Sequence, residues 1–294
     1  MKLKKESNGG VRIKRHIRNL IFCLMLICSL FVVADVKAEE MNNTGYERIK
    51  VRHETENNTY DMEFIYSDEM LLKDARKKSP ELAKVSIALA AGAYDQESIT
   101  NTLKDMKYTL RSQKAYDKKF SIWNNDHVAY TISSKNVEGN DGKEYIIYSV
   151  VVRGTSKNSE WYSNFNMGKT GDHEGFYKAA DEVMDDLQEI LKKDYGKNRI
   201  PVVWVTGHSR GAAVANVIAG KLTLKYAGNN SDPNVLKPQH IFGYTYACPN
   251  VSKNAQESCQ NIYNFNKLSA NTKNCRFFFN FFFTYFYNIL HFSF

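Results

Sequence analysis

The sequence lacks the paired cysteines and histidines that mark metal sites and redox centres. Five cysteines are spread over 294 residues, and no C-x-x-C or H-E-x-x-H motif places two ligands at a metal-binding spacing. A glycine-rich phosphate-binding loop is absent as well. We therefore expect no metal ion and no cofactor, and nothing in the spacing of the cysteines indicates a disulfide framework.

A large net charge is also lacking once the N-terminus is set aside. The formal net charge is +8, but residues 1–38 hold eight Lys and Arg against two Asp and Glu, which leaves +2 for the rest of the chain. A basic surface of the kind that binds nucleic acid is therefore not expected. The remaining 256 residues suffice for one domain with a substantial core.

The basic N-terminus precedes an apolar run, Leu20–Ala34, and then the small-residue segment Val36–Ala38. This order is typical of a secretory signal peptide with its cleavage site. The apolar run is shorter than the ~20 residues of a membrane-spanning helix, although an uncleaved anchor is the alternative. We expect residues 1–38 to be a signal peptide, and the protein to be secreted or associated with the cell envelope.

Hydrophobic periodicity predicts an α/β domain over residues 79–265, after a leader at 39–78 whose first part, 39–58, is polar and loose. Two strand-like runs around a glycine-containing loop at 136–143 predict an antiparallel hairpin. After residue 144 strands alternate with long helices, which indicates a mainly parallel sheet with helices on both faces. The expected helices cover residues 79–94, 97–108, 175–195 and 210–227, and the expected strands cover residues 59–66, 127–134, 144–152, 201–206, 240–247 and 261–265.

The clearest motif is a G-x-S-x-G pentapeptide, Gly207–Gly211, between the apolar run 201–206 and a helix rich in small residues. A strand, a sharp turn and a helix in this order form a nucleophile elbow, which holds Ser209 in strained geometry at the carboxyl end of the sheet. Gly207 and Gly211 permit the turn because a side chain there would crowd the helix against the strand. The alternative is an ordinary tight turn with an idle serine.

With the elbow in place, the chain resembles the class 3 (fungal-type) lipases, in their bacterial secreted branch. The motifs that carry the resemblance are Val151–Thr155, Glu160–Trp161 with Asn164, His173–Phe176, Thr206–Gly211, Cys248–Val251 and Asn261–Phe265. The resemblance implies an α/β-hydrolase fold, a carboxylic ester substrate, in particular a lipid ester, and transient contact with a lipid surface. It also implies that Ser209 is the nucleophile and that the backbone N–H groups of Thr155 and Arg210 form the oxyanion hole.

The resemblance ends after residue 265, although the triad acid and histidine of this family come after the strand that Asn261–Phe265 resembles. No Asp or Glu follows Glu257, and eleven of residues 277–294 are Phe or Tyr without a helical or strand period. We interpret residues 266–294 as an aberrant tail, produced by a frameshift or a mispredicted gene end, that leaves the fold incomplete. The alternative is a genuine hydrophobic anchor.

The other acids and histidines suit the missing roles poorly. His208 is expected to be structural, because it points away from the nucleophile's side of the turn, and His173 is expected to orient a loop. Asp232 and His240 are expected at the opposite end of the sheet, and His291 lies in the tail. No triad acid or histidine is identified.

These observations predict a secreted serine carboxylic-ester hydrolase of the lipase type that works through an acyl-enzyme and is impaired by the missing triad partners. The alternative is a non-catalytic exported or membrane-associated protein that retains the hydrolase fold. Acyl transfer to an alcohol would use the same residues. The apolar residues within 161–167 form either a lid, as in the family, or an ordinary packed loop. The oligomeric state leaves no signal in the sequence.

Overall fold

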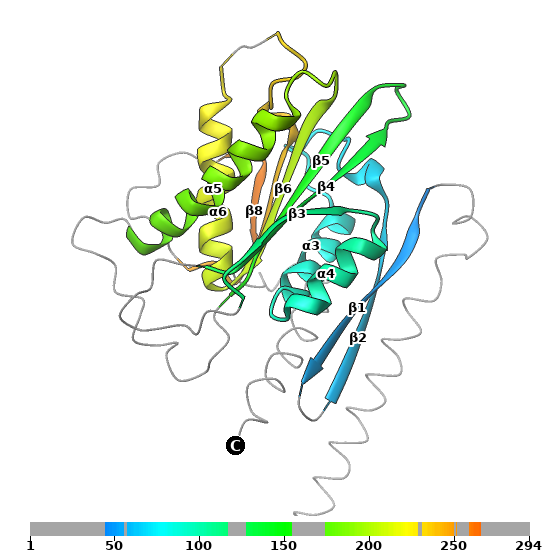
Figure 1. Cartoon of the computed structure of the whole chain (residues 1–294), viewed down its shortest axis with the longest axis vertical. Coiled ribbons are helices and arrows are strands. Elements are labelled where there is room, and N and C mark those ends of the chain that lie inside the picture. The colour runs from blue at the N-terminus through cyan, green and yellow to red at the C-terminus, as the bar shows by residue number, and fades with distance from the viewer. Residues whose placement is uncertain are drawn as a thin grey trace, which may run out of the picture. The chain divides into compact units, whose positions relative to one another are not determined.

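Among the residues that the structure describes, six strands form one sheet in the order β3-β4-β5-β6-β7-β8 (Figure 1). The strands are β3 (Thr109–Lys114), β4 (Tyr130–Glu138), β5 (Glu144–Val152), β6 (Ile200–His208), β7 (Ile241–Tyr246) and β8 (Ile262–Phe265). β3, β4 and β5 pair antiparallel, whereas β5 to β8 pair parallel. The computed structural model describes residues 45–55, 58–116, 128–154, 174–228, 231–249, 251 and 259–265.

Helices cover both faces of the sheet. α5 (Glu174–Asp194) and α6 (Arg210–Lys225) lie on one face, and α3 (Pro80–Gly92) and α4 (Gln96–Asp105) lie on the other (Figure 1). β5 alternates accordingly, because Tyr148 and Val150 belong to the core under α5 and α6, whereas Ile147 and Val151 belong to the core under α3 and α4. The predicted α/β architecture, a mainly parallel sheet with helices on both faces and an antiparallel hairpin, is confirmed.

The helices on the second face begin where their capping residues predict. Ser79 accepts a hydrogen bond from the Leu82 backbone N–H at 3.1 Å, and Pro80 occupies the first turn of α3. Asp95 caps α4 in the same way, through a 2.6 Å bond from the Ser98 N–H. The two helices are therefore separated by only a short turn, which holds Tyr94.

A second, two-stranded sheet differs from the prediction. β1 (Glu47–Thr55) pairs antiparallel with β2 (Asn58–Tyr66), so the expectation of a loose segment over residues 39–58 is wrong for Glu47–Thr55. Ile49 and Val51 of β1 are buried in the core beside α3, and Tyr66 of β2 stacks on Trp204 of β6 with ring centroids 6.3 Å apart. β1 is mostly polar, and its alternate apolar residues are the ones that enter the core.

The predicted hairpin is confirmed as β4 and β5, with Tyr130 opposite Val152 and Glu138 opposite Glu144. β3 was not predicted, because it is mostly polar; apart from its backbone pairing with β4, polar side chains tie it to α5. Arg111 of β3 donates to Asp194 of α5 at 2.7 Å, and Ser112 donates to Asp186 at 2.8 Å. Within the part of the chain that the structure describes, no helix is long and apolar enough to cross a membrane.

Candidate active site

Ser209 lies in a sharp turn between β6 and α6. Its φ of 54° and ψ of −124° are strained for a residue with a side chain. Its backbone N–H donates to the Tyr246 carbonyl of β7 at 2.9 Å, and its carbonyl accepts from Ala212 at 2.9 Å and Ala213 at 3.1 Å. The side chain makes no capping hydrogen bond to α6. The backbone of Ser209 is therefore fixed on both sides, while its hydroxyl does not serve the helix.

The two flanking glycines stand where the helix meets the sheet. A Cβ on Gly207 would lie 2.5 Å from the Gly211 carbonyl oxygen, and a Cβ on Gly211 would lie 2.4 Å from the Val152 carbonyl oxygen. Both contacts are with backbone, which cannot swing aside. The start of α6 therefore packs directly on the carboxyl ends of β5 and β6.

The carboxyl end of β5 forms the neighbouring wall of the site. The Arg153 N–H donates to the Ala129 carbonyl at 2.8 Å, and the Arg153 guanidinium lies over the Tyr116 ring, 5.0 Å from its centroid. Arg210, the first residue of α6, carries its backbone N–H at the positive end of the helix dipole. Thr155, the other expected oxyanion donor, lies outside the described residues, as do His173, His291 and residues 161–167.

His208 is engaged with a residue that the sequence analysis did not single out. Its Nδ1 lies 2.9 Å from the Tyr94 hydroxyl, with the two rings tilted at 57°. Burial lowers the pKa of His208 to about 3, so the imidazole is neutral at physiological pH. No sequence signal pointed to Tyr94, because a tyrosine in a short turn between helices gives no indication of a contact more than a hundred residues away.

His240 and Asp232, two further candidates for the histidine and acid of a triad, are remote from the elbow. His240 ends the short helix η3 (Pro238–His240), directly before β7, and β7 runs parallel to β6. His240 is therefore at the amino end of the sheet, opposite Ser209, and burial lowers its pKa to about 4. Asp232 accepts a 2.7 Å hydrogen bond from the hydroxyl of Tyr195, which follows α5. This geometry agrees with the expectation that Asp232 and His240 lie at the end of the sheet opposite Ser209.

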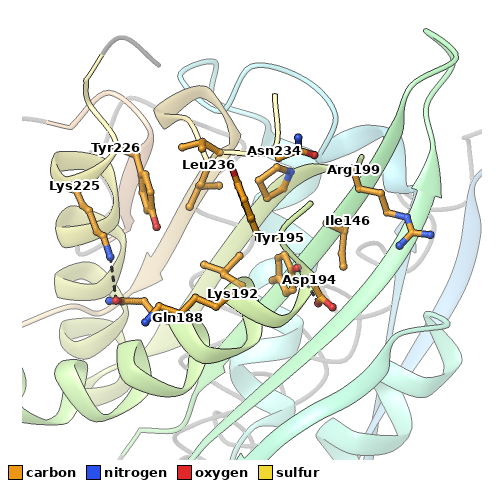
Figure 2. A pocket seen from close by; sticks show the side chains of 14 residues that line it. Ile146, Gln188, Lys192, Asp194, Tyr195, Arg199, Lys225, Tyr226, Asn234 and Leu236 are labelled. Atoms are coloured by element: carbon orange, nitrogen blue, oxygen red, sulfur yellow. Dashed lines mark hydrogen bonds between the residues drawn. The ribbon is translucent and has the colours of Figure 1, made fainter. Parts of the chain in front are cut away.

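A cavity of about 150 Å³ also lies at that amino end, between the ends of α5 and α6 (Figure 2). Several of its polar groups already have partners within the chain, although Arg199 Nε, which also lines the cavity, is buried without a hydrogen-bond partner in the described part of the chain. Lys225 donates to Gln188 at 3.0 Å, as the dashed line in Figure 2 shows. Asp194 accepts from Arg111 at 2.7 Å and from Lys197 at 2.6 Å. This cavity is separate from the elbow, and among the described residues no cluster of His, Cys, Asp and Glu could hold a metal ion.

Several fungal lipases of known structure are similar to this chain. Rhizomucor miehei triacylglyceride lipase is 20% identical, with 61% of this chain and 66% of that chain covered and a TM-score of 0.43. The lipase from Rhizopus microsporus var. chinensis is 17% identical, with 60% and 61% covered and a TM-score of 0.39. Lipase II from Rhizopus niveus is 16% identical, with 70% and 67% covered and a TM-score of 0.36. Likeness at this level carries no argument about activity.

The chain spans 66% of the length of the Rhizomucor miehei lipase and 61% of the Rhizopus microsporus lipase. A comparison with curated protein sequences found no match. The family model described as Lipase (class 3) matches residues 149–268. That segment runs from the carboxyl half of β5 to β8 and contains the elbow, so this part of the chain is similar to the class 3 lipases.

Proposed function

We propose that this chain is a serine hydrolase of the lipase type, which cleaves a carboxylic ester, in particular a lipid ester, through an acyl-enzyme on Ser209. One observation carries the proposal: a serine with φ of 54° at the junction of β6 and α6, within the segment similar to the class 3 lipases. A positive φ at a serine is costly, and such strain is kept where the side chain must be presented.

The proposed chemistry follows from the elbow. The Ser209 oxygen attacks the ester carbonyl carbon, and its proton passes to a general base. The carbonyl oxygen becomes an oxyanion, stabilised by the backbone N–H of Arg210 and, from the resemblance, of Thr155. When the tetrahedral intermediate collapses, the alcohol leaves with a proton, and water then cleaves the acyl-enzyme in the same way. One oxyanion donor is worth about 3–4 kcal/mol of barrier in known enzymes.

The general base is the weak point of the site. Of the histidine side chains that the structure describes, His208 is bonded to Tyr94 and His240 is at the other end of the sheet. Because neither of these histidines is placed as a base for Ser209, we further propose that the chain hydrolyses esters slowly unless a base is supplied. The signal-like segment 1–38 supports secretion or attachment to the cell envelope, and transient contact with a lipid surface belongs to the same proposal.

The test compares the full chain with Ser209→Ala in the hydrolysis of a short-chain p-nitrophenyl ester, with and without added imidazole. Imidazole in solution can take the role of the missing base, and Ser209→Ala corrects for its own background reaction. We expect imidazole to raise the serine-dependent rate, defined as the rate of the chain minus that of Ser209→Ala.

A high serine-dependent rate without imidazole would support the hydrolase and contradict the impairment. No serine-dependent rate under either condition would contradict the nucleophile itself. It would favour the non-catalytic alternative. A linear dependence of the serine-dependent rate on imidazole concentration is the expected signature, because the added base then acts in the rate-limiting step.

A further inference from the structure

The Tyr94 hydroxyl and the His208 carbonyl lie close to Gly154, which follows β5 and is the last residue of the described range 128–154. A Cβ on Gly154 would lie 2.1 Å from the Tyr94 hydroxyl oxygen and 2.7 Å from the His208 carbonyl oxygen. The same hydroxyl is 2.9 Å from His208 Nδ1. Gly154 is therefore packed closely against a phenol that is bonded to His208 and against the backbone of His208 itself.

This contact joins three elements that are distant in the sequence. Tyr94 comes from the turn between α3 and α4, and Gly154 follows the end of β5 by two residues. His208 ends β6, one residue before Ser209. β5 ends at Val152, so the sheet ladder does not extend to Gly154. The last backbone bond before it is that of the Arg153 N–H to the Ala129 carbonyl, and beyond it Gly154 is packed against the Tyr94 hydroxyl and the His208 backbone.

We propose that Tyr94 and His208 are a positioning pair, which fixes the Gly154 peptide against the elbow so that the end of β5 forms one wall of the oxyanion site. The claim that this pair supports catalysis rests on the proposed function. The claim that it fixes the Gly154 peptide does not. Neither residue touches the reacting atoms in this account. Both act through Gly154.

Tyr94 and His208 both stay uncharged over a wide range of pH, so their contact persists. Burial lowers the pKa of His208 to about 3 and raises the pKa of Tyr94 above its usual value, so both side chains stay uncharged at physiological pH. The hydrogen bond can run in either direction, according to the tautomer of His208. The contact is therefore insensitive to pH over the range in which ester hydrolases are assayed.

The first test removes the hydroxyl alone and reads the order of the Gly154 backbone. Tyr94→Phe keeps the ring, and Tyr108→Phe is the matched control because it removes a buried phenol that is bonded to Tyr66 at 2.8 Å, away from the elbow. The readout is the NMR order parameter of the Gly154 amide in the full chain. We expect it to fall from about 0.85 toward 0.6 in Tyr94→Phe, and to stay unchanged in Tyr108→Phe.

The second test asks for rescue at the partner. In His208→Asn the side-chain amide lies near the position of Nδ1 and can bond the Tyr94 hydroxyl, whereas His208→Leu cannot. We expect His208→Asn to keep the Gly154 order parameter near that of the unmodified chain and His208→Leu to reproduce Tyr94→Phe. Equal order parameters in all variants, or an equal fall in Tyr108→Phe, would overturn the positioning role.

The third test uses the imidazole-assisted hydrolysis described above. We expect Tyr94→Phe to lower kcat by roughly tenfold to a hundredfold, the scale of a misplaced reacting group, and to leave KM within about twofold. A lower Gly154 order parameter with an unchanged kcat would overturn the claim that the pair supports catalysis. If Ser209→Ala shows that the proposed function is wrong, the order parameter still decides whether Tyr94 and His208 position Gly154, so the two failures are distinguishable.

Discussion

Substituting Gly211 by alanine tests the packing of the elbow most sharply. Gly211 is the second residue of α6, and an added Cβ would lie 2.4 Å from the Val152 oxygen, 2.7 Å from the Arg153 carbonyl carbon and 2.8 Å from the Arg153 oxygen. Real Cβ atoms essentially never come within 3.0 Å of another heavy atom. All three contacts are with backbone, so the start of α6 must move away from β5.

The cost can be worked from the same helix. Overpacking of this kind lowers the free energy of unfolding by about 1–3 kcal/mol. We expect Gly211→Ala at the upper end of this range, because the added Cβ would meet backbone atoms that cannot rotate away. Gly220 is the matched control, because it lies inside α6 with nothing within 4 Å of its added Cβ. Gly220→Ala should gain about 0.5–1 kcal/mol, since alanine restricts the unfolded chain and favours the helix. The free energies of unfolding of the two variants should therefore differ by about 3.5–4 kcal/mol, because their effects have opposite signs.

Urea unfolding followed by circular dichroism measures both variants. With a slope of about 2–3 kcal/mol per molar urea, the midpoints of the two variants should differ by about 1 M or more. A midpoint for Gly211→Ala at or above that of the unmodified chain would refute the close packing of α6 on β5. The serine-dependent hydrolysis of Gly211→Ala should fall as well, because the displaced helix carries the Arg210 N–H with it.

Three further predictions follow from single contacts. Ser209→Gly should raise the free energy of unfolding by about 1 kcal/mol, because glycine accepts a positive φ without strain, while Ser209→Ala should not; equal stability in thermal unfolding would argue against strain. The pKa of His208 is about 3 in the folded chain and about 6.5 in the unfolded chain. As the pH falls below 6.5 the unfolded state therefore binds the proton first, and the free energy of unfolding decreases by up to about 1.4 kcal/mol per pH unit. Between pH 7 and pH 5 this decrease should be about 2 kcal/mol smaller in His208→Asn, and parallel pH profiles of the two proteins would contradict the prediction. Ser86→Ala should cost about 1–3 kcal/mol, because Trp204 Nε1 donates to Ser86 Oγ at 2.9 Å in the core; urea unfolding read by tryptophan fluorescence would show no shift if that bond were dispensable.

Local signals explain what the sequence predicted well. The Ser79 cap with Pro80 gave the start of α3, the glycine-containing loop gave the hairpin of β4 and β5, and the β-branched run before Gly207 gave β6. Each of these depends on residues within a few positions of one another. The mainly parallel sheet was predicted because long helices alternate with the strands after residue 144.

Contacts between distant residues explain what the sequence missed. β3 is held by Arg111 and Ser112 through Asp194 and Asp186 of α5, some 80 positions away, and its own residues are polar. Tyr94 meets His208 across 114 positions. Such pairings depend on where the fold brings the side chains, which periodicity and capping residues do not encode.

Covalent labelling of Ser209 is the most direct test of the central claim. The full chain is treated with a fluorophosphonate in the presence of imidazole, and the adduct is located by peptide mass spectrometry, with Ser209→Ala as the control. The account predicts one principal adduct, on Ser209, that is absent from the variant. Adducts spread over surface tyrosines and lysines, with Ser209 unmodified, would contradict it.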